Sequence, residues 1–444
     1  MRKLFGTDGM RGIAGEPPLD AATTFAVGTA LGKWIGQHHF DPEVVIGMDT
    51  RESGPGIAAH VAGGLEQEGV RARFAGLITT PGIAHVTRTG PFAAGVMISA
   101  SHNPYHDNGI KIIDHSGFKL PDEQEHAIEQ DIFAWLGTGE VPKPAELATD
   151  HGLDQAYIDA LAATLPAGLA GLRLVVDASN GAATYLAPAL FERLGATVDR
   201  IHCAPDGKNI NLHCGSQHLE SLRERVMETR ADLGVAFDGD ADRAMFISHS
   251  GKVVDGDMVM LVAALPLHAG GRLTEVIATV MSNLGLELAL KAHGIELVRT
   301  PVGDKYVLDE MVKRNAPLGG EQSGHIIFRD YATTGDGLLT ALRVLEAMRE
   351  SGRDLDALTA EFVSYPQLLV NVRVKERRPL AELESVNAGI RRAQGEFGES
   401  GRVLVRFSGT EPLARVMVEG PAIDRVTYHA HAIADAIGKE LGVA

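Results

Sequence analysis

Short apolar runs alternate with helix-period segments along most of this chain, and this alternation restricts the folds that it can adopt. Apolar runs stand at residues 44–48, 72–75 and 95–99, and segments of helical periodicity stand at 57–68 and 122–136. Strands that are apolar throughout are typical of sheets with both faces covered, and the intervening helices supply that cover. The pattern therefore predicts βαβ units with parallel strands.

The alternation resumes twice further along the chain. We predict strands at 172–176, 198–202, 233–237, 276–280 and 296–299, and helices at 182–194, 284–292 and 305–314. The C-terminal part has a different pattern, in which strands at 368–374, 402–407 and 415–419 accompany helices at 380–394 and 424–438. This last part predicts a small α+β unit.

The length of the chain requires several domains. It has 444 residues, whereas one hydrophobic core stops growing at roughly 250–300 residues. We expect the fold class α/β, with three α/β domains that contain mixed, mainly parallel sheets and a smaller C-terminal α+β domain. The predicted domains cover residues 1–150, 151–251, 252–365 and 366–444.

The formal net charge of −17 restricts the partners of the protein. Nucleic acids and anionic membranes are bound chiefly through Lys and Arg, so we expect neither as a partner, although a local basic cleft can still bind a small anion. No apolar run approaches the roughly 20 residues of a membrane span. The N-terminus lacks the apolar stretch of a signal peptide, and two cysteines make no disulfide framework. We therefore expect a cytoplasmic protein.

The most informative motif is SASHNP at residues 99–104, directly after the apolar strand that ends at Ile98. Open α/β sheets bind their ligands at the carboxyl ends of strands, and Pro104 prevents a helix from starting at once. Ser101 is therefore expected on a loop, and Lys111 adds a cation near the same strand end. A lone Ser-His pair would be an ordinary polar turn, but this combination favours a functional loop.

The second motif is DGDADR at residues 238–243, which follows the predicted strand at 233–237. Side chains two residues apart in an extended segment point the same way, so Asp238, Asp240 and Asp242 can converge on one hard cation. A calcium-binding EF-hand would need Gly and Glu at positions that here hold other residues, and a solvated acidic loop does not suit the apolar strand before it. We predict a magnesium site with room for a phosphate oxygen.

Two motifs in the second half of the chain suit sugar phosphates. Residues 406–412 (RFSGTEP), with Arg415 nearby, offer arginines, hydroxyls and a glycine-opened backbone for a phosphate. In residues 319–325 (GGEQSGH), carboxylate and hydroxyl side chains could bind sugar hydroxyls, and the histidine could move a proton. Arg11, in the N-terminal motif FGTDGMRG, is a further candidate to bind phosphate. Alone, each motif could be an ordinary turn.

These five stretches, in this order, resemble the α-D-phosphohexomutase superfamily over essentially the whole chain. Three features resemble its bacterial branch that acts on glucosamine phosphates: FGTDGMRG at 5–12, Gln322, and NIN at 209–211 leading to CGSQH at 214–218. His213 and Gln217 depart from the usual pattern of that last stretch, which concerns local packing rather than chemistry. For Cys214 we expect a structural role, because the His-Cys pairs of this chain match no common zinc spacing.

The resemblance implies domains arranged around a central cleft and the interconversion of glucosamine 6-phosphate and glucosamine 1-phosphate. The reaction would use phosphorylated Ser101, Mg²⁺ and a 1,6-bisphosphate intermediate, with glucosamine or glucose 1,6-bisphosphate as activator, and would supply UDP-N-acetylglucosamine and cell-wall synthesis. Small-molecule sugar phosphates are the implied partners, with a possible homodimer.

The resemblance also implies roles for individual residues. The implied catalytic residues are Ser101, Lys111, His325, Arg11 and Arg243. The implied metal ligands are an oxygen of phosphorylated Ser101, Asp238, Asp240 and Asp242. The implied substrate-binding residues are Gly303, Asp304, Glu321, Ser323, Arg406, Ser408, Gly409, Thr410 and Arg415.

Other functions on the same motifs stay open at this point. A phosphomannomutase or phosphoglucomutase would share Ser101 and the aspartates and differ in the sugar bound. A non-catalytic sugar-phosphate sensor could lose the nucleophile or the metal ligands, yet all of them are present. A metal-dependent phosphatase would use water as its nucleophile and release phosphate. The general base, Lys111 or His325, also stays open.

Overall fold

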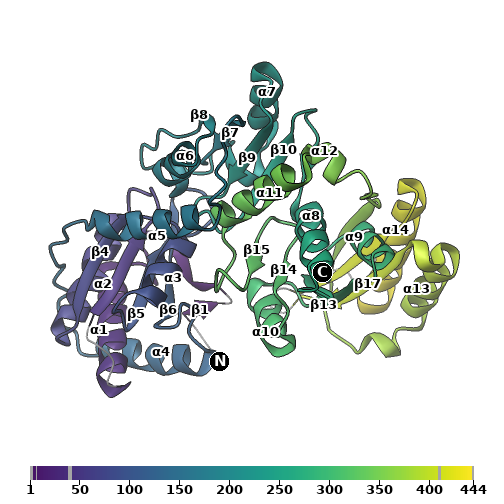
Figure 1. The fold of residues 1–444 in the computed structure, drawn as a ribbon. Coiled ribbons are helices and arrows are strands. Elements are labelled where there is room, and N and C mark those ends of the chain that lie inside the picture. Colours follow the sequence, from purple (N-terminus) through teal and green to yellow (C-terminus); the bar gives the residue numbers. More distant parts are fainter. Residues whose placement is uncertain (1–3, 7, 39–42, 409–411, 443–444) are drawn as a thin grey trace. The chain divides into compact units, whose positions relative to one another are not determined.

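The computed structural model describes residues 4–6, 8–38, 43–408 and 412–442. The chain divides into two compact units (Figure 1). The first unit comprises Met1–Val280 and Val298–Thr359, and the second comprises Met281–Leu297 and Ala360–Ala444. The four predicted domain ranges stay predictions. Among the helices of the described residues, none is long and apolar enough to cross a membrane.

The first sheet of the first unit combines parallel central strands with antiparallel neighbours. Its strands are β1 (Phe5–Gly6), β2 (Gly9–Ile13), β3 (Glu43–Met48), β4 (Arg71–Leu77), β5 (Ala94–Ile98) and β6 (Asp107–Asp114), in the order β1-β2-β6-β5-β3-β4. Strand β3 runs parallel to β4 and β5, whereas β6 is antiparallel to β5 and to β2. Because β6 returns alongside β5, its residues lie next to the loop that follows β5.

Helices cover both faces of this sheet. They are α1 (Ala21–His38), α2 (Gly54–Gln67), α3 (Thr80–Thr89) and α4 (Asp122–Leu136). Side chains alternate between the faces of a strand: Val44 and Ile46 join the core cluster that contains Trp135 of α4. On the other face, a Cβ on Gly47 would lie 2.6 Å from Cδ1 of Ile83 in α3. The first sheet is therefore the middle layer of three.

Two further sheets of the first unit follow the same plan. The second contains β7 (Arg173–Asp177), β8 (Thr197–Ile201), β9 (Leu233–Phe237), β10 (Ala244–Ser248) and β11 (Val253–Val254), in the order β11-β10-β9-β7-β8. The third contains β12 (Glu275–Thr279), β13 (Glu296–Thr300), β14 (Leu318–Gly320) and β15 (Ile326–Phe328), in the order β13-β12-β14-β15. The accompanying helices are α5 (His151–Ala163), α6 (Ala183–Arg193), η1 (Gly215–Gln217), α7 (Glu220–Thr229), α8 (Gly256–Ala269), α10 (Asp304–Arg314), α11 (Gly337–Ser351) and α12 (Leu355–Leu358).

The second unit is a small antiparallel sheet with helices. Its strands β16 (Gln367–Arg373), β17 (Arg402–Phe407) and β18 (Leu413–Glu419) are ordered β16-β18-β17, and both pairs are antiparallel. Its helices are α9 (Leu284–Ala292), η2 (Leu380–Glu382), α13 (Glu384–Phe397), η3 (Gly398–Ser400) and α14 (Ile423–Leu441). Apolar residues of β18 and α14, among them Val416 and Ile433, form its core.

The predicted fold class is confirmed: the chain is α/β, with mixed sheets and a smaller C-terminal α+β part. The predicted strand at 233–237 and the predicted helix at 284–292 have the observed bounds. Helix α1 was not predicted, because its sequence is largely apolar and much of it is buried, so that little helical periodicity remains. Strand β6 was not predicted either, and Lys111 was the only residue of this strand noted from the sequence.

Helices α1 and α2 approach so closely at Gly28 that no side chain fits there. A Cβ on Gly28 would lie 1.9 Å from the carbonyl oxygen of Val61, whereas a Cβ on Gly36, also in α1, would meet nothing within 4 Å. We expect Gly28→Ala to lower the free energy of unfolding by about 1–3 kcal/mol or more through overpacking. The matched control Gly36→Ala should raise it by about 0.5–1 kcal/mol, since Ala is the better helix former. Urea unfolding of both variants measures this, and equal shifts in the same direction would contradict the packing described.

Candidate active site

Ser101 stands on a tight loop immediately after β5. It is 1% exposed, and its backbone has a φ of 51°, in the left-handed region. The backbone N–H of Ser101 donates to Ser99 Oγ at 2.9 Å, and that hydroxyl donates to Asp49 Oδ2 at 2.6 Å. The loop predicted from Pro104 and the strand end is therefore present, and a chain of hydrogen bonds fixes its conformation.

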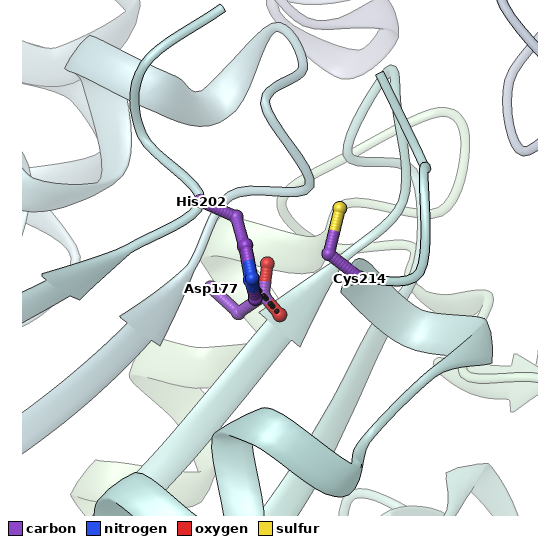
Figure 2. A group of neighbouring side chains, drawn as sticks. All are labelled: Asp177, His202 and Cys214. Carbon is purple, nitrogen blue, oxygen red and sulfur yellow. Dashed lines mark hydrogen bonds and ion pairs between the residues drawn. The ribbon is translucent and has the colours of Figure 1, made fainter. Parts of the chain in front are cut away.

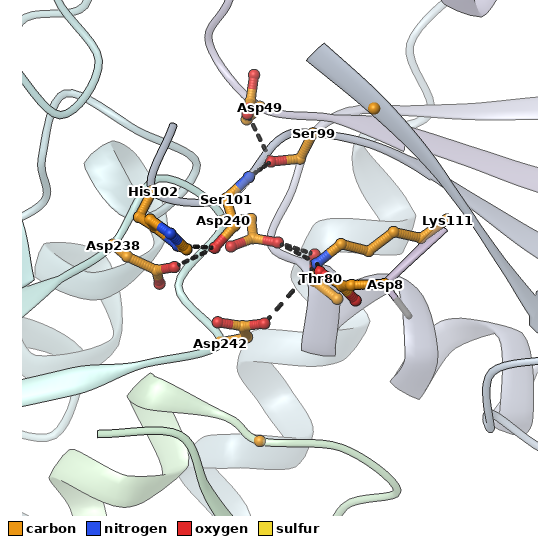
Figure 3. A network of polar contacts seen from close by, with 12 residues as sticks. Asp8, Asp49, Thr80, Ser99, Ser101, His102, Lys111, Asp238, Asp240 and Asp242 are labelled. Carbon is orange, nitrogen blue, oxygen red and sulfur yellow. Dashed lines mark hydrogen bonds and ion pairs between the residues drawn. The ribbon is translucent and has the colours of Figure 1, made fainter. Parts of the chain in front are cut away.

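Asp238, Asp240 and Asp242 follow β9 on another tight loop (Figure 3). All three are buried, and each offers a carboxylate oxygen within 4.8 Å of those of the other two. In the described part of the chain, Asp240 Oδ1 and Asp242 Oδ1 are buried without a hydrogen-bond partner. Buried carboxylate oxygens require compensation, and a small hard cation that takes oxygen ligands would supply it. The donor set therefore fits Mg²⁺.

The two loops are in direct contact, although Ser101 and Asp238 are 137 residues apart in the sequence. Ser101 Oγ donates to Asp238 Oδ2 at 2.5 Å. Thr80, at the start of α3, donates its hydroxyl to Asp240 Oδ2 at 2.5 Å and its backbone N–H to the Asp240 carbonyl at 3.0 Å. The hydroxyl of Ser101 thus lies at the edge of the aspartate cluster, so the structure brings together the loop and the metal site that the two motifs predicted separately.

Lys111 projects from β6 into the same cluster (Figure 3). Its Nζ lies 2.9 Å from Asp240, 3.2 Å from Asp8 and 3.8 Å from Asp242, and the residue is 2% exposed. Burial by itself would lower the pKa of Lys111, but Asp240, Asp8 and Asp242 together raise it well above its ordinary value. Lys111 is therefore an ammonium ion at neutral pH.

The surroundings shift the pKa values of Asp238 and Asp242 in opposite directions. Burial, together with the negative charges of Asp242 and Asp240, raises the pKa of Asp238 well above the ordinary carboxyl range. Burial also acts to raise the pKa of Asp242, but His325 and Lys111 lower it overall. Without a metal ion, Asp238 therefore keeps a proton more readily than Asp242 does.

His325 and Arg243 lie on the other side of the cluster. The Gly335 backbone N–H donates to His325 Nε2 at 3.1 Å, and Nδ1 lies 3.5 Å from Asp242 Oδ2. Burial acts to lower the pKa of His325, but nearby carboxylates, Asp242 foremost, raise it overall. The backbone N–H of Arg243 donates to Asp238 Oδ1 at 3.2 Å. The aspartate loop thus contacts the side chain of His325 and the backbone of Arg243.

A cavity of about 430 Å³ beside the cluster brings several of the predicted residues together. The predicted residues among its lining are Arg11, Asp242, Arg243, Gly303, Asp304, Glu321 and His325. Glu321 Oε1 accepts the Gly303 backbone N–H at 3.1 Å. Ser323 is exposed and is not among the lining residues.

Sequence reasoning missed residues that complete this cavity. Asp8, within the N-terminal motif, pairs with Arg11, Lys111 and Lys119. Lys119 also reaches Asp304 at 2.5 Å, so it ties the first sheet to the start of α10. The acid in FGTDGMRG was a usable signal for Asp8, whereas nothing in the sequence around Lys119 marked it.

The predicted phosphate-binding residues belong to the second unit. Arg406 in β17 stands directly opposite Arg415 in β18, and Ser408 is 3% exposed. Burial and the charge of Arg415 lower the pKa of Arg406. Two guanidinium groups at one register position can together bind an anion. Gly409 and Thr410 lie outside the described residues.

Asp177, His202 and Cys214 form a second cluster, within 4.8 Å of one another (Figure 2). The carboxylate of Asp177 already accepts hydrogen bonds: from the Ser179 N–H at 2.8 Å, from the Gly215 N–H at 3.0 Å and from His202 Nδ1 at 2.9 Å. Burial, with the nearby Asp177 charge, raises the pKa of Cys214 to about 12, so its thiol is protonated at neutral pH. These contacts favour the structural role expected for Cys214.

Family models match four consecutive segments of the chain. They describe phosphoglucomutase/phosphomannomutase alpha/beta/alpha domain I at residues 2–136, domain II at 155–251, domain III at 255–365 and the C-terminal domain at 369–436. The chain is 57% identical over 443 residues to a phosphoglucosamine mutase of Solibacter usitatus, with 99% of each chain covered. It is 48% identical to one of Koribacter versatilis, with 100% of this chain and 98% of the relative covered.

Solved structures share the fold at lower identity. A phosphoglucomutase/phosphomannomutase family protein of Burkholderia thailandensis is 23% identical, with a TM-score of 0.80 over 98% of this chain and 97% of that one. An N-acetylphosphoglucosamine mutase of Aspergillus fumigatus, solved with GlcNAc-6P and magnesium, is 19% identical, with a TM-score of 0.63 over 98% and 96%. A variant of this fungal enzyme has also been solved with glucose 1,6-bisphosphate.

Mg²⁺ and a proton should compete for the aspartate cluster. Because the pKa of Asp238 is raised in the metal-free protein, Mg²⁺ binding below that pKa must release a proton, and the affinity must increase as pH rises until Asp238 is ionised. Calorimetric titration with Mg²⁺ between about pH 5 and pH 8, in buffers of different ionisation enthalpy, counts the protons released.

The variant Asp238→Asn should abolish this proton release and weaken Mg²⁺ binding by about 10- to 100-fold or more. Asp199→Asn is the matched control, since Asp199 lies in β8 of the same sheet and pairs with Arg225 instead. The same pH dependence in Asp238→Asn and in the unmodified protein would contradict the site.

Proposed function

Because the chain belongs to the phosphoglucomutase/phosphomannomutase family, we propose that it interconverts glucosamine 6-phosphate and glucosamine 1-phosphate. The observation that carries the proposal is the hydrogen bond of 2.5 Å from Ser101 Oγ to Asp238, which joins a nucleophile to a metal-binding cluster. The choice of amino sugar is supported by the full-length relatives, which are named phosphoglucosamine mutases. The product would feed the synthesis of UDP-N-acetylglucosamine and of the cell wall.

The reaction is two successive phosphoryl transfers through Ser101. Phosphorylated Ser101 gives its phosphoryl group to the 1-hydroxyl of glucosamine 6-phosphate: the P–O bond to serine breaks as one to the sugar forms, the 1-hydroxyl loses its proton and the Ser101 oxygen takes one up. The sugar 1,6-bisphosphate then reorients, and its 6-phosphoryl group moves to Ser101, whose hydroxyl loses its proton while the sugar 6-oxygen takes one up. Glucosamine 1-phosphate leaves, and the phosphorylated serine is regenerated. In-line geometry and charge neutralisation are the main requirements of such transfers.

Asp238, Asp240 and Asp242, with an oxygen of phosphorylated Ser101, are the proposed ligands of Mg²⁺. When bound, Mg²⁺ would neutralise charge on the phosphoryl group and on the serine oxygen that leaves. The buried, unpartnered oxygens of Asp240 and Asp242 in the described part of the chain support this assignment. The hydroxyl of Thr80 donates to Asp240 Oδ2, and its backbone N–H donates to the Asp240 carbonyl. These two hydrogen bonds orient the proposed ligand.

Lys111, Arg243 and Arg11 are the proposed charge-stabilising residues. The raised pKa of Lys111 keeps its ammonium group charged next to Asp240, close to the Ser101 loop. Arg243 and Arg11 line the cavity, where guanidinium groups suit the oxygens of a phosphoryl group. Fixed positive charges in a site of low water content stabilise developing negative charge without reorganisation.

His325 fits the role of general base better than Lys111 does. A base must be able to take up a proton near neutral pH, and the carboxylates around Lys111 hold it in its protonated form. His325 lines the cavity, and imidazole has an ordinary pKa near neutral pH, although nearby carboxylates raise the pKa of His325 as well. To act as a base, Nε2 must exchange the hydrogen bond that it accepts from the Gly335 N–H for the proton. Asp242, 3.5 Å from Nδ1, would stabilise the imidazolium after proton uptake.

Glu321, Ser323, Gly303 and Asp304 are the proposed sugar-binding residues. Three of them line the cavity, and the bond from the Gly303 N–H to Glu321 fixes the carboxylate in place. A carboxylate can accept hydrogen bonds from sugar hydroxyls and can pair with the ammonium group of glucosamine. The negative charge of Glu321 therefore favours an amino sugar over a neutral hexose.

Arg406, Ser408, Gly409, Thr410 and Arg415 are proposed to bind the phosphate that does not react. The like-charged cross-strand pair of Arg406 and Arg415 supports this assignment, because such a pair is suited to an anion. Glucosamine or glucose 1,6-bisphosphate would act as activator by rephosphorylating Ser101 when its phosphoryl group is lost. A cytoplasmic location and a possible homodimer stay predictions.

Phosphorus NMR of the protein with Mg²⁺ and a trace of hexose 1,6-bisphosphate tests the proposal. Glucosamine 6-phosphate should be converted to the 1-phosphate in preference to glucose 6-phosphate and mannose 6-phosphate. Ser101→Ala should lower the rate by about 10³-fold or more, because no phosphoryl carrier remains. Ser351→Ala, an exposed serine at the end of α11, is the control.

The alternatives give different spectra. Preference for mannose or glucose phosphates would make the protein a phosphomannomutase or phosphoglucomutase, and free phosphate as the sole product would make it a phosphatase. Full activity of Ser101→Ala would contradict the phosphoserine mechanism.

A further inference from the structure

We propose that Asn211 is a positioning residue that holds the Ser101 loop in the conformation needed for phosphoryl transfer. The motif NIN at residues 209–211 was notable in the sequence, yet the reaction as described assigns it no part. Asn211 lies between β8 and η1, in the loop that joins two elements of the second sheet. The inference rests on the proposed function, because it gives Asn211 a part in the reaction at Ser101.

The side chain of Asn211 reaches the backbone of the Ser101 loop. Its Nδ2 donates to the Ser101 carbonyl at 2.9 Å and to the Asn103 carbonyl at 3.1 Å. Both acceptors are more than 100 residues away in sequence and belong to the loop after β5. One amide group of the second sheet therefore fixes the backbone orientation of the loop that carries the nucleophile.

Arg51 binds the same two carbonyls from the side of the first sheet. Its Nη2 donates to the Ser101 carbonyl at 3.0 Å and to the Asn103 carbonyl at 2.8 Å, and its Nε pairs with Asp49 at 2.9 Å. The residue is 1% exposed. Each carbonyl is thus bound by Arg51 from one side and by Asn211 from the other, so loss of Asn211 would leave these carbonyls with Arg51 alone and only the hydroxyl of Ser101 bonded to Asp238.

The metal-binding loop shares this contact. A Cβ on Gly239 would lie 2.4 Å from the Ser101 carbonyl oxygen and 2.9 Å from Asn211 Nδ2. Gly239 stands between Asp238, which accepts the Ser101 hydroxyl, and Asp240. A shift of the Ser101 backbone away from Asn211 would therefore change the position of Oγ relative to the aspartates.

The loop that contains Asn211 forms hydrogen bonds at both of its ends to the same carboxylate oxygen. Asp177 Oδ2 accepts from His202 Nδ1 at 2.9 Å and from the Gly215 N–H at 3.0 Å (Figure 2). The Asn211 N–H donates to the Ser179 carbonyl at 2.9 Å, two residues beyond Asp177. The hydrogen bonds of the Asp177 cluster therefore hold the loop in a conformation in which Asn211 faces Ser101.

Two substitutions test Asn211 without adding backbone strain. Its φ is 59°, a conformation that Gly and Asp tolerate. Asn211→Gly removes the side chain, and Asn211→Asp keeps its shape but removes the N–H donor. Leu212→Ala is the control, since Leu212 is the next residue of the loop and its side chain is 59% exposed.

For each variant we would measure kcat and KM for the sugar phosphate, the melting temperature, and hydrogen exchange of the peptide that contains Ser101. Both Asn211 variants should lower kcat by about 10- to 100-fold, because a small displacement of a reacting group has effects of this size. KM and the melting temperature should stay close to those of the unmodified protein, and exchange in the Ser101 loop should become faster. Leu212→Ala should leave all of these unchanged.

Unchanged kcat and unchanged exchange in both Asn211 variants would overturn the inference. Failure of both variants to fold would also overturn it, because Asn211 would then be a general structural residue. Failure of the proposed function gives a different result. If the unmodified protein lacks mutase activity, the proposed function is wrong. Faster exchange of the Ser101 loop in the Asn211 variants would then still show that Asn211 holds this loop.

Discussion

The burial of three aspartates on one short loop is the electrostatic constraint on which the rest of the site depends. Asp238, Asp240 and Asp242 are all buried within reach of one another, and removing like charges from water is costly. Lys111 and Arg243 offset part of this cost from within the first unit. In the described part of the chain, Asp240 Oδ1 and Asp242 Oδ1 are buried without a hydrogen bond. A bound cation would neutralise the negative charge on these oxygens.

This constraint explains why groups from two sheets converge. Ser101 comes from the end of β5, Lys111 from the adjacent antiparallel β6, and the aspartates from the end of β9. The loops touch closely enough that Gly239 has no room for a side chain beside the Ser101 carbonyl. The proposed phosphoryl carrier, its proposed metal ligands and a fixed cation are thereby held together.

The sequence allowed the fold class and the central residues to be predicted because their signals are local. Apolar strands, helix periodicity and the spacing of Asp238, Asp240 and Asp242 can be read within short windows. Contacts such as those of Thr80 with Asp240, or of Asn211 with Ser101, could not be read in this way. Each joins residues more than 100 positions apart, and a threonine or asparagine by itself has many ordinary roles.

Charge states were the other part that the sequence left open. Lys111 and His325 were both candidates for the base, and the structure shows that neighbouring carboxylates raise the pKa of each. The pairing of Arg406 with Arg415 likewise required the register of β17 and β18. In each case the residue was predictable from its motif, whereas its electrostatic environment depends on which distant segments pack against it.

The most direct test follows the phosphoryl group itself. The protein would be incubated with Mg²⁺ and hexose 1,6-bisphosphate labelled with radioactive phosphorus and then divided. One portion would be digested so that mass spectrometry maps the labelled residue, and the other portion would be mixed intact with unlabelled glucosamine 6-phosphate. The proposed mechanism requires one labelled residue, Ser101, and transfer of that label to the sugar at least as fast as overall turnover. Label on another residue, or its release to water as phosphate, would contradict it.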